Sequence, residues 1–392
     1  MAALDFPHTI DTLSAAWLAT VFGAKPTRFA AEFLEGGMLA DAYRLRLEWP
    51  RGHSDLPASA VVKLPTAIEA QRQMALDNSF YRKEVSFFRD LAAHVPVRMP
   101  KVYAALDDGS SEAESFVILM EDLGTDFLPF DQVNDQPAAP HVATFCDTVA
   151  LLHGTLWESD LLREDWISPG GRYVFPVDAI SRQCSGQIEP LRRAWRQYYG
   201  SEVFAIADTP SVEPLTEIIA GPKSELLLDY ITSLLDARPK TLLHGDLRCD
   251  NLFRTKDVVP EAAELAIIDW QLVHGGPPGP EFTQAWMHSL PIELRRRDTD
   301  MLRRYHARLV EVAPAAAAYT VEMLLEDYRL GYLLYWMMNV ALFPQILPGT
   351  DTAPDGERML RLYELVMRSM QIALEDHNCL DLVQRLSAEL RG

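Results

Sequence analysis

The first third of the chain carries the alternation of apolar and polar residues that is typical of β-strands. Between residues 42 and 49, apolar or aromatic residues alternate with charged ones, as expected for a strand with one buried face. Apolar residues at helical spacing occur in residues 12–22 and 78–93. Shorter apolar runs predict further strands at residues 59–64, 102–106 and 115–120.

Helical spacing predominates in the rest of the chain, at residues 142–157, 190–199 and 224–235 and in several stretches after residue 282. A segment rich in Pro, Asp and Asn, residues 126–140, comes before this part and predicts a loop or linker. One non-helical island, residues 242–270, contains two short apolar runs around a polar turn, which predicts a hairpin. The patterns therefore predict an α+β protein with a mostly β lobe, residues 1–123, and a mostly α lobe, residues 124–392.

The composition fits a globular protein with a large core and argues against some partners. Of the 392 residues, 48% are apolar and 23% are charged. The 36 Lys and Arg residues against 56 Asp and Glu residues leave a formal charge of -20, so the surface repels nucleic acids and anionic membranes. We therefore expect no nucleic-acid partner. An acidic surface also suits a cationic substrate, but in most proteins it serves solubility.

The cysteines indicate a reducing compartment, and the apolar segments indicate a protein that does not cross a membrane. The four cysteines form no CxxC pair, so we interpret them as free thiols. The first ten residues lack the basic and apolar regions of a signal peptide. The longest apolar stretch, residues 330–343, contains Asn339 and is too short to span a bilayer, so it predicts a buried helix. We expect a cytoplasmic protein without a membrane span, and the sequence leaves its oligomeric state open.

The non-helical island carries side chains suited to phosphoryl transfer. It contains the run HGDLRCDN from His244 to Asn251, and Asp269 follows the predicted hairpin. Asp246 can accept or orient the proton of a hydroxyl, and Arg248 can offset the charge on a transferred phosphate. Asn251 and Asp269 offer the oxygen ligands that magnesium prefers. Each residue alone is ordinarily explained by turn chemistry, but this combination at this spacing seldom arises by chance.

This run resembles the catalytic loop of the aminoglycoside phosphotransferase and choline kinase superfamily, distant relatives of the protein kinases. Within that superfamily the chain is similar to the ecdysteroid-kinase-like (CHK-kinase-like) group and its bacterial relatives. Those families carry His-Gly-Asp with Asn five residues after the Asp, and an Asp-Phe or Asp-Trp that here is Asp269-Trp270. Further matching segments, in the family's order, are Trp17-Leu18, Gly36-Gly37, 61–65, 80–88, 120–123, 151–153 and 276–279.

The resemblance implies a protein-kinase-like, two-lobed fold. Its N-terminal lobe is expected to hold an antiparallel sheet with one main helix, and its C-terminal lobe to be mostly helical with a short catalytic-loop hairpin. ATP and Mg²⁺ are the implied cofactors. Lys63 is expected to contact the α- and β-phosphates while paired with Glu84. Glycines allow a close backbone approach to phosphate, and the expected flap and adenine-binding hinge consist of Gly36, Gly37, Met120, Glu121 and Leu123.

The resemblance also implies supporting roles around the catalytic loop. His244 is expected to brace the loop through backbone hydrogen bonds, and His153 is expected to be a packed helix histidine. Glu281 stands where many relatives have an aspartate, and it is expected to brace the loop through a backbone or arginine contact.

The predicted function is transfer of the γ-phosphate of ATP to a hydroxyl of a small, apolar molecule. Residues 328–338 are rich in aromatic residues and methionine, and packing in the core is the first explanation of this composition. If some of these side chains line the acceptor site, they favour an apolar acceptor. The alternative is an antibiotic phosphotransferase acting on an aminoglycoside or a macrolide. Acidic residues near the C-terminus, Glu375, Asp376, Asp381 and Glu389, have instead the pattern of a solvated face. A non-catalytic nucleotide-binding pseudokinase is the third hypothesis, although Lys63, Asp246 and Asp269 are all present.

Overall fold

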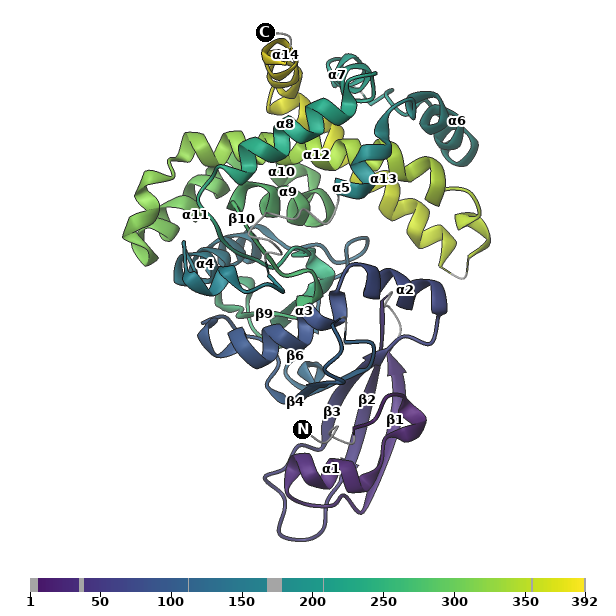
Figure 1. Ribbon diagram of the computed structural model, residues 1–392, viewed down its shortest axis with the longest axis vertical. Helices are drawn as coiled ribbons and strands as arrows, with labels where there is room; N and C mark the ends of the chain where they lie inside the picture. Colours follow the sequence, from purple (N-terminus) through teal and green to yellow (C-terminus); the bar gives the residue numbers. More distant parts are fainter. Residues whose placement is uncertain are drawn as a thin grey trace. The chain divides into compact units, whose positions relative to one another are not determined.

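The computed structural model describes residues 6–34, 39–111, 113–167, 178–206, 208–353 and 355–390. The chain forms two compact units, one of Met1–Leu128 with Ala266–Val273 and the other of Pro129–Leu265 with His274–Gly392 (Figure 1). The segment Ala266–Val273, which contains Asp269, therefore belongs to the same unit as Lys63. The lobe boundary predicted after residue 123 stays a prediction.

A five-stranded antiparallel sheet forms the centre of the first unit. Its strands are β1 (Arg28–Leu34), β2 (Ala40–Glu48), β3 (Ser59–Pro65), β4 (Val102–Asp107) and β5 (Phe116–Glu121), in the order β1-β2-β3-β5-β4. Strands β2 to β5 confirm the four stretches in which strands were predicted. They agree because successive side chains of a strand point to opposite faces, which gives the alternation seen in residues 42–49, and because the other three stretches are short apolar runs.

The two faces of this sheet contribute to separate cores. On one face, Val62 and Leu64 of β3 pack in a cluster that includes Leu18 of α1 (Ala15–Phe22). Lys63 lies between them in the strand, and successive strand residues point to opposite faces. The side chain of Lys63 is therefore on the face that holds the second cluster, which includes Val85 of α3 (Phe80–Ser86).

The helix predicted at residues 78–93 is present but interrupted. Helix α3 ends at Ser86 and a π-helical turn, Phe87–Leu91, follows it; such turns are frequent at functional sites. Another helix, α2 (Glu69–Asp77), was not predicted. Ala75 is its one fully buried residue, so the sequence there shows no apolar stripe.

Helices dominate the second unit, as the apolar spacing predicted (Figure 1). They are α4 (Ala139–Thr155), α5 (Asp178–Ser181), α6 (Ile188–Tyr199), α7 (Val212–Ile219), α8 (Ser224–Asp236), α9 (Pro278–Ser289), α10 (Ile292–Arg295), α11 (Asp298–Val312), α12 (Val321–Ile346), α13 (Gly356–Asp376) and α14 (Cys379–Glu389). The buried helix predicted around residues 330–343 is confirmed as part of α12. Within the ranges that the structure describes, no helix combines the length and the apolar character needed to cross a membrane.

Short strands flank the run from His244 to Asn251. Strand β7 (Thr241–Leu243) pairs antiparallel with β10 (His274–Gly276), and the run begins directly after β7. Strand β8 (Leu252–Thr255) follows it, and the N–H of Thr255 donates to the carbonyl of Glu264 at 3.1 Å, which closes the predicted turn. The remaining short strands are β6 (Phe127–Pro129) and β9 (Leu265–Ile267).

Two glycines allow α9 and α12 to pack closely. A Cβ atom on Gly279 would lie 2.5 Å from the backbone nitrogen of Tyr328, and one on Gly331 would lie 2.9 Å from the Cα atom of Pro280. Larger residues are therefore excluded at both contact points. The hydroxyl of Thr283 on α9 also donates to the Tyr328 carbonyl at 2.9 Å. These contacts hold in place the helix whose side chains reach the catalytic loop.

Candidate active site

The lysine predicted to bind phosphate forms the ion pair that the resemblance implies. The Nζ atom of Lys63 on β3 lies 2.9 Å and 2.7 Å from the two carboxylate oxygens of Glu84 on α3. Lys63 is 9% exposed and Glu84 is 1% exposed. The pair therefore holds the ammonium group in one position, as phosphoryl transfer requires of a phosphate-binding lysine. The contact of Lys63 with a nucleotide stays a prediction.

A second carboxylate reaches the same ammonium group. Lys63 Nζ donates to Oδ1 of Asp269 at 2.6 Å, and Gln271 Nε2 donates to Oδ2 at 3.1 Å. Asp269 has a φ of 66°, a left-handed conformation that is uncommon outside glycine and occurs often at functional sites. A carboxylate is a ligand type that magnesium prefers, and the role of Asp269 as a metal ligand stays a prediction.

Trp270 anchors the segment that carries Asp269. It is fully buried and stacks on Phe87, with ring centroids 4.1 Å apart and an interplanar angle of 7°. Phe87 belongs to the π-helical turn after α3. In the same segment, the N–H of Ile267 donates to the carbonyl of Arg98 at 2.9 Å. These contacts place the carboxylate of Asp269 next to the lysine on β3.

The two carboxylates keep the buried lysine charged. Burial alone would lower the pKa of Lys63, but Asp269 and Glu84 raise it above its ordinary value. Burial raises the pKa of Glu84, and Asp269 acts in the same direction, against the effect of Lys63. The ammonium group is therefore a fixed positive charge, which a phosphate group can approach.

Glu121, predicted in the adenine-binding hinge, has a structural side chain. Its carboxylate accepts from Nη2 of Arg98 at 2.6 Å and from the N–H of Lys101 at 2.9 Å. Its own N–H donates to the Lys101 carbonyl at 2.8 Å and is therefore already satisfied. Leu123 opens the short 3₁₀ turn that follows, and adenine binding by this hinge stays a prediction.

The structure says less about the other predicted nucleotide contacts. Met120 lies on β5 and packs against the cluster that contains Val85 of α3, so it is placed between the sheet and this helix. Gly36 and Gly37, the predicted flap, lie outside the described residues. Both assignments stay predictions.

Glu281 braces the start of the catalytic loop, as predicted. Its Oε2 accepts from the N–H of His244 at 3.0 Å, and its Oε1 accepts from the N–H of Gly245 at 2.7 Å. The brace acts through the backbone, one of the two forms predicted. His244 in turn accepts the N–H of Asp246 on its Nδ1 at 3.2 Å. Two side chains therefore fix the backbone that carries Asp246.

A buried histidine supports this glutamate. His153 on α4 lies 3.1 Å from Glu281 through Nε2 and 2.8 Å from the hydroxyl of Tyr305 through Nδ1. Burial alone would raise the pKa of Glu281, but hydrogen bonds from His153 and from the N–H of Gly245 lower it below its ordinary value. The predicted packing of His153 in the helix is confirmed, and it also supports an ionised Glu281.

The carboxylate of Asp246 is held by two side-chain amides. Asn251 Nδ2 donates to the Asp246 carbonyl at 2.9 Å and to its Oδ2 at 3.1 Å. Gln284 Nε2 on α9 donates to Oδ1 at 2.6 Å. Arg248 also approaches this carboxylate, with Nε 3.3 Å from Oδ2. The structure therefore brings Asp246, Arg248 and Asn251 together, whereas the contact of Arg248 with a phosphate stays a prediction.

Gln284 and its neighbour on the same helix face, His288, were missed in the sequence. Together with Glu281 they occupy positions i, i+3 and i+7 of α9, which share one face of a helix. Burial and the charge of Arg248 lower the pKa of His288 to about 4. The spacing from Glu281 was the available signal, but neutral glutamine and histidine residues on a helix match no catalytic motif.

The two donors predicted for a metal offer oxygen atoms, one in each unit, and their joint binding of magnesium stays a prediction. Among the described residues, no three His, Cys, Asp or Glu side chains are grouped as in a metal-binding cluster. The predicted donors are instead the carboxylate of Asp269 and the amide of Asn251. Asn251 turns its Nδ2 towards Asp246, so its Oδ1 is the amide atom available to a cation. A small number of oxygen donors from the protein fits magnesium, because its other ligands come from phosphates and water.

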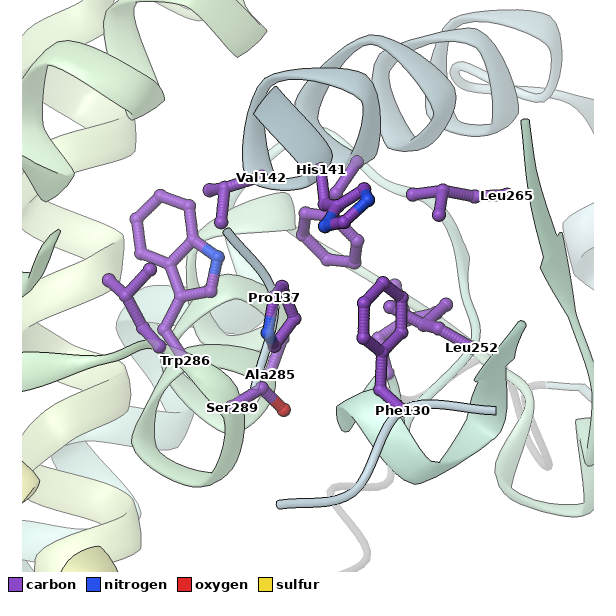
Figure 2. A pocket seen from close by; sticks show the side chains of 12 residues that line it. Phe130, Pro137, His141, Val142, Leu252, Leu265, Ala285, Trp286 and Ser289 are labelled. Atoms are coloured by element: carbon purple, nitrogen blue, oxygen red, sulfur yellow. The ribbon is translucent and has the colours of Figure 1, made fainter. Parts of the chain in front are cut away.

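The second unit contains a small apolar pocket (Figure 2). Leu247 of the loop and Val142, Phe145 and Trp286 of helices α4 and α9 line it. Its free volume is about 20 Å³, room for about one water molecule, and Asp246 does not line it. It is therefore a packing gap of the core and not a site for an acceptor molecule.

The aromatic stretch 328–338 of α12 packs in the core. Tyr328, Tyr332 and Trp336 are fully buried. The hydroxyls of Tyr328 and Tyr332 accept hydrogen bonds from the buried guanidinium of Arg295. These side chains thus give no support to an apolar acceptor site, and core packing, the first explanation from the sequence, accounts for them.

Comparison with protein families gives one match. A family named DUF1679 and described as "Uncharacterized oxidoreductase dhs-27" matches residues 202–379, less than half of the chain. It is an ecdysteroid-kinase-like family, and the matched part includes the whole run from His244 to Asn251 as well as Asp269. The sequence contains no G-x-G-x-x-G fingerprint of a dinucleotide-binding oxidoreductase. No curated protein matches the chain significantly.

A solved structure shares the fold, and others are similar to the chain to a lesser degree. A protein from Ralstonia eutropha JMP134, described as a candidate aminoglycoside phosphotransferase, matches with a TM-score of 0.50 and 14% identity, over 92% of this chain and 96% of that one. This likeness confirms the kinase-like α+β fold. An ethanolamine kinase from Plasmodium vivax has a TM-score of 0.43 and 10% identity over 87% and 82% of the two chains. A microcompartment-associated aminopropanol kinase has a TM-score of 0.42 and 14% identity over 95% and 97%.

Proposed function

We propose that this protein is an ATP- and magnesium-dependent phosphotransferase that acts on a hydroxyl group of a small molecule. The observation that carries the proposal is the buried ammonium of Lys63, which is held by both Glu84 and Asp269. Strand β3, helix α3 and the segment after β9 contribute these three side chains. Apolar residues in place of such a whole buried charged group would often give equal stability, but the charged group suits phosphate binding beside a metal ligand.

In this proposal the first unit handles the nucleotide. Lys63 binds the α- and β-phosphates, and Glu84 keeps its ammonium group in position. Asp269 is the magnesium ligand of this unit. Magnesium, when bound, offsets the negative charge of the phosphates. The hinge from Met120 to Leu123 binds the adenine edge through backbone groups.

The second unit handles the acceptor. Asp246 takes the proton of the acceptor hydroxyl as the new bond from that oxygen to the γ-phosphorus forms. The bond between the γ-phosphorus and the bridging oxygen breaks, and ADP leaves with the bonding electron pair. Asn251 provides an amide oxygen for magnesium, and Arg248 offsets charge on the transferred group. Glu281 and Gln284 keep Asp246 in position.

An antibiotic phosphotransferase remains the second candidate, because the Ralstonia eutropha protein of the same fold is described as a candidate aminoglycoside phosphotransferase. Two of the four acidic residues near the C-terminus do not favour it. Glu375 accepts from the N–H and hydroxyl of Ser211 at 2.9 Å and 2.6 Å, and Glu389 accepts from the Tyr230 hydroxyl at 2.8 Å. These carboxylates already have structural partners, so they are poor candidates for binding a polycationic acceptor.

The proposal is tested by nucleotide binding and ADP release. We expect ATP to raise the thermal unfolding midpoint more with Mg²⁺ than without it, and acceptor-dependent ADP release to be measurable in a screen of hydroxylated metabolites and antibiotics. Asp246→Asn should lower turnover by about 10²- to 10⁴-fold and leave ATP binding nearly intact.

A matched control is Asp250→Asn in the same loop. Asp250 accepts from the N–H of Gln132 at 3.1 Å, a bond that an asparagine oxygen can keep, so turnover should change little. Magnesium-independent ATP binding without turnover would favour the pseudokinase hypothesis. Equal turnover in wild type and Asp246→Asn would remove Asp246 from the mechanism.

A further inference from the structure

Gln284 presents a second polar atom beside the proposed catalytic carboxylate. Its Nε2 donates to Asp246 Oδ1 at 2.6 Å, so the whole planar amide lies against Asp246. The other end of that amide, Oε1, is buried and lacks a hydrogen-bond partner among the described residues. Gln284 itself is 6% exposed. An acceptor atom without a donor is therefore held next to the carboxylate that takes the proton.

His288 presents a similar atom one helical turn later. Its Nδ1 is also buried without a hydrogen-bond partner in the described part of the chain. Positions 284 and 288 lie four residues apart on α9, so their side chains are neighbours on one helix face. The next residue of α9, Ser289, accepts the N–H of Cys249 on its hydroxyl oxygen at 2.6 Å, so this part of the helix lies against the run from His244 to Asn251.

Two unpartnered polar atoms on one face are costly for a folded protein. A buried polar atom without a hydrogen bond costs about 1–3 kcal/mol, and such atoms are rare unless a ligand or water satisfies them. Here both belong to the helix that holds Asp246. We propose that Gln284 Oε1 and His288 Nδ1 form a subsite for a second hydroxyl group of the acceptor, which makes the acceptor a diol. This inference rests on the proposed function.

The chemistry of the subsite suits a hydroxyl group. Oε1 accepts hydrogen bonds, and a neutral imidazole nitrogen can accept or donate one, depending on the tautomer. Both groups suit an O–H. Because Nε2 and Oε1 share one amide, a hydroxyl bound at Oε1 lies beside the one at Asp246, as on adjacent carbons.

The test compares matched alcohols in an ADP-release assay with Mg·ATP. The pairs are cyclohexane-1,2-diol with cyclohexanol and 1,2-propanediol with 1-propanol. We expect the wild type to favour each diol by at least about tenfold in kcat/KM, the effect of one satisfied hydrogen bond. His288→Leu and Gln284→Met should reduce this ratio towards one. A loss of positioning at Asp246 would instead lower both rates and leave the ratio unchanged.

His288→Asn is the conservative variant, because its side chain keeps a polar atom near the position of Nδ1. It should restore part of the diol preference, and thermal unfolding confirms that each variant is folded. An unchanged ratio in folded His288→Leu and Gln284→Met, or no use of either diol by the wild type, would overturn the subsite.

The slow hydrolysis of Mg·ATP with water as acceptor separates the two claims. If this hydrolysis is present in the wild type and lost in Asp246→Asn, but no diol is preferred, the subsite is wrong and the proposed function stands. If the wild type shows neither magnesium-dependent hydrolysis nor ATP binding, the proposed function itself fails.

Discussion

The ammonium group of Lys63 lies 2.6 Å from a carboxylate oxygen of Asp269, although 206 positions separate the two residues in the chain. Glu84 contacts the same ammonium from α3. The lysine is thus the shared partner of two acidic side chains from separate segments. The positive charge of Lys63 therefore balances the two carboxylates, and it also holds Asp269, the proposed metal ligand, in position.

Lys63→Met should therefore affect both activity and stability. Turnover of Mg·ATP is expected to fall by about 10²- to 10³-fold, since one fixed charge near the phosphates is lost. The free energy of unfolding should fall by about 3–5 kcal/mol, because two buried carboxylates lose their cation. ADP release and urea unfolding measure the two effects.

Lys101→Met is the matched control in the same unit. The Lys101 ammonium lies 5.5 Å from the ring centroid of Tyr103, and the residue is exposed, so its loss should cost less than about 1 kcal/mol. Similar unfolding free energies for the two variants would contradict the role assigned to Lys63.

Glu281→Gln should loosen the catalytic loop. The carboxylate accepts from two backbone N–H groups, whereas an amide would turn one N–H donor towards another. We expect a loss of about 1–3 kcal/mol in unfolding free energy, together with a lower kcat. Glu281→Asp keeps both acceptor oxygens and the charge, so its losses should be smaller. Equal defects in both variants would show that the charge and the two acceptors are irrelevant.

His288 should make the stability of the protein dependent on pH. Its pKa falls from an ordinary value of 6.5 to about 4 in the folded protein, so between these values the unfolded chain binds the proton more readily. The contribution of neutral His288 to the free energy of unfolding is therefore fully present above pH 6.5, and it is lost as the pH falls towards 4. The difference between the two pKa values corresponds to roughly 3 kcal/mol.

Urea unfolding at a series of pH values, for the wild type and His288→Asn, measures this contribution. The wild type should lose more stability than the variant between pH 6.5 and 4. Parallel curves for the two proteins would show that His288 titrates normally in the folded state.

Arg295 should be important for the stability of the second unit. Its guanidinium is 1% exposed and contacts Asp298 at 3.3 Å and the Tyr328 hydroxyl at 2.9 Å. Arg295→Met leaves a buried carboxylate with weaker compensation, so the free energy of unfolding should fall by about 3–5 kcal/mol.

Arg308→Met provides the comparison on the surface. Arg308 lies 2.8 Å from Glu311, and its side chain is 45% exposed, so this change should cost less than about 1 kcal/mol. Calorimetric unfolding measures the loss of stability in both variants. The expectation fails if Arg295→Met is as stable as Arg308→Met.

Secondary structure could be predicted where a segment buries one face. Helices α6 and α8 agree with the predictions to within two residues, because each has an apolar stripe. Helix α2 could not be predicted, since nearly all of its residues face solvent. The π-helical turn after α3 has a hydrogen-bond register that apolar spacing does not encode.

The sequence by itself determined the reaction type that we propose, because Asp246, Arg248 and Asn251 lie within one short run whose spacing is local. Tertiary structure decided which residues far apart in the chain contact one another. Gln284 on helix α9 donates to Asp246, and Asp269, which follows strand β9, accepts from Lys63 on strand β3. Such pairings depend on the packing of whole elements, such as the close contact of α9 with α12, and many weak contacts spread along the chain set that packing.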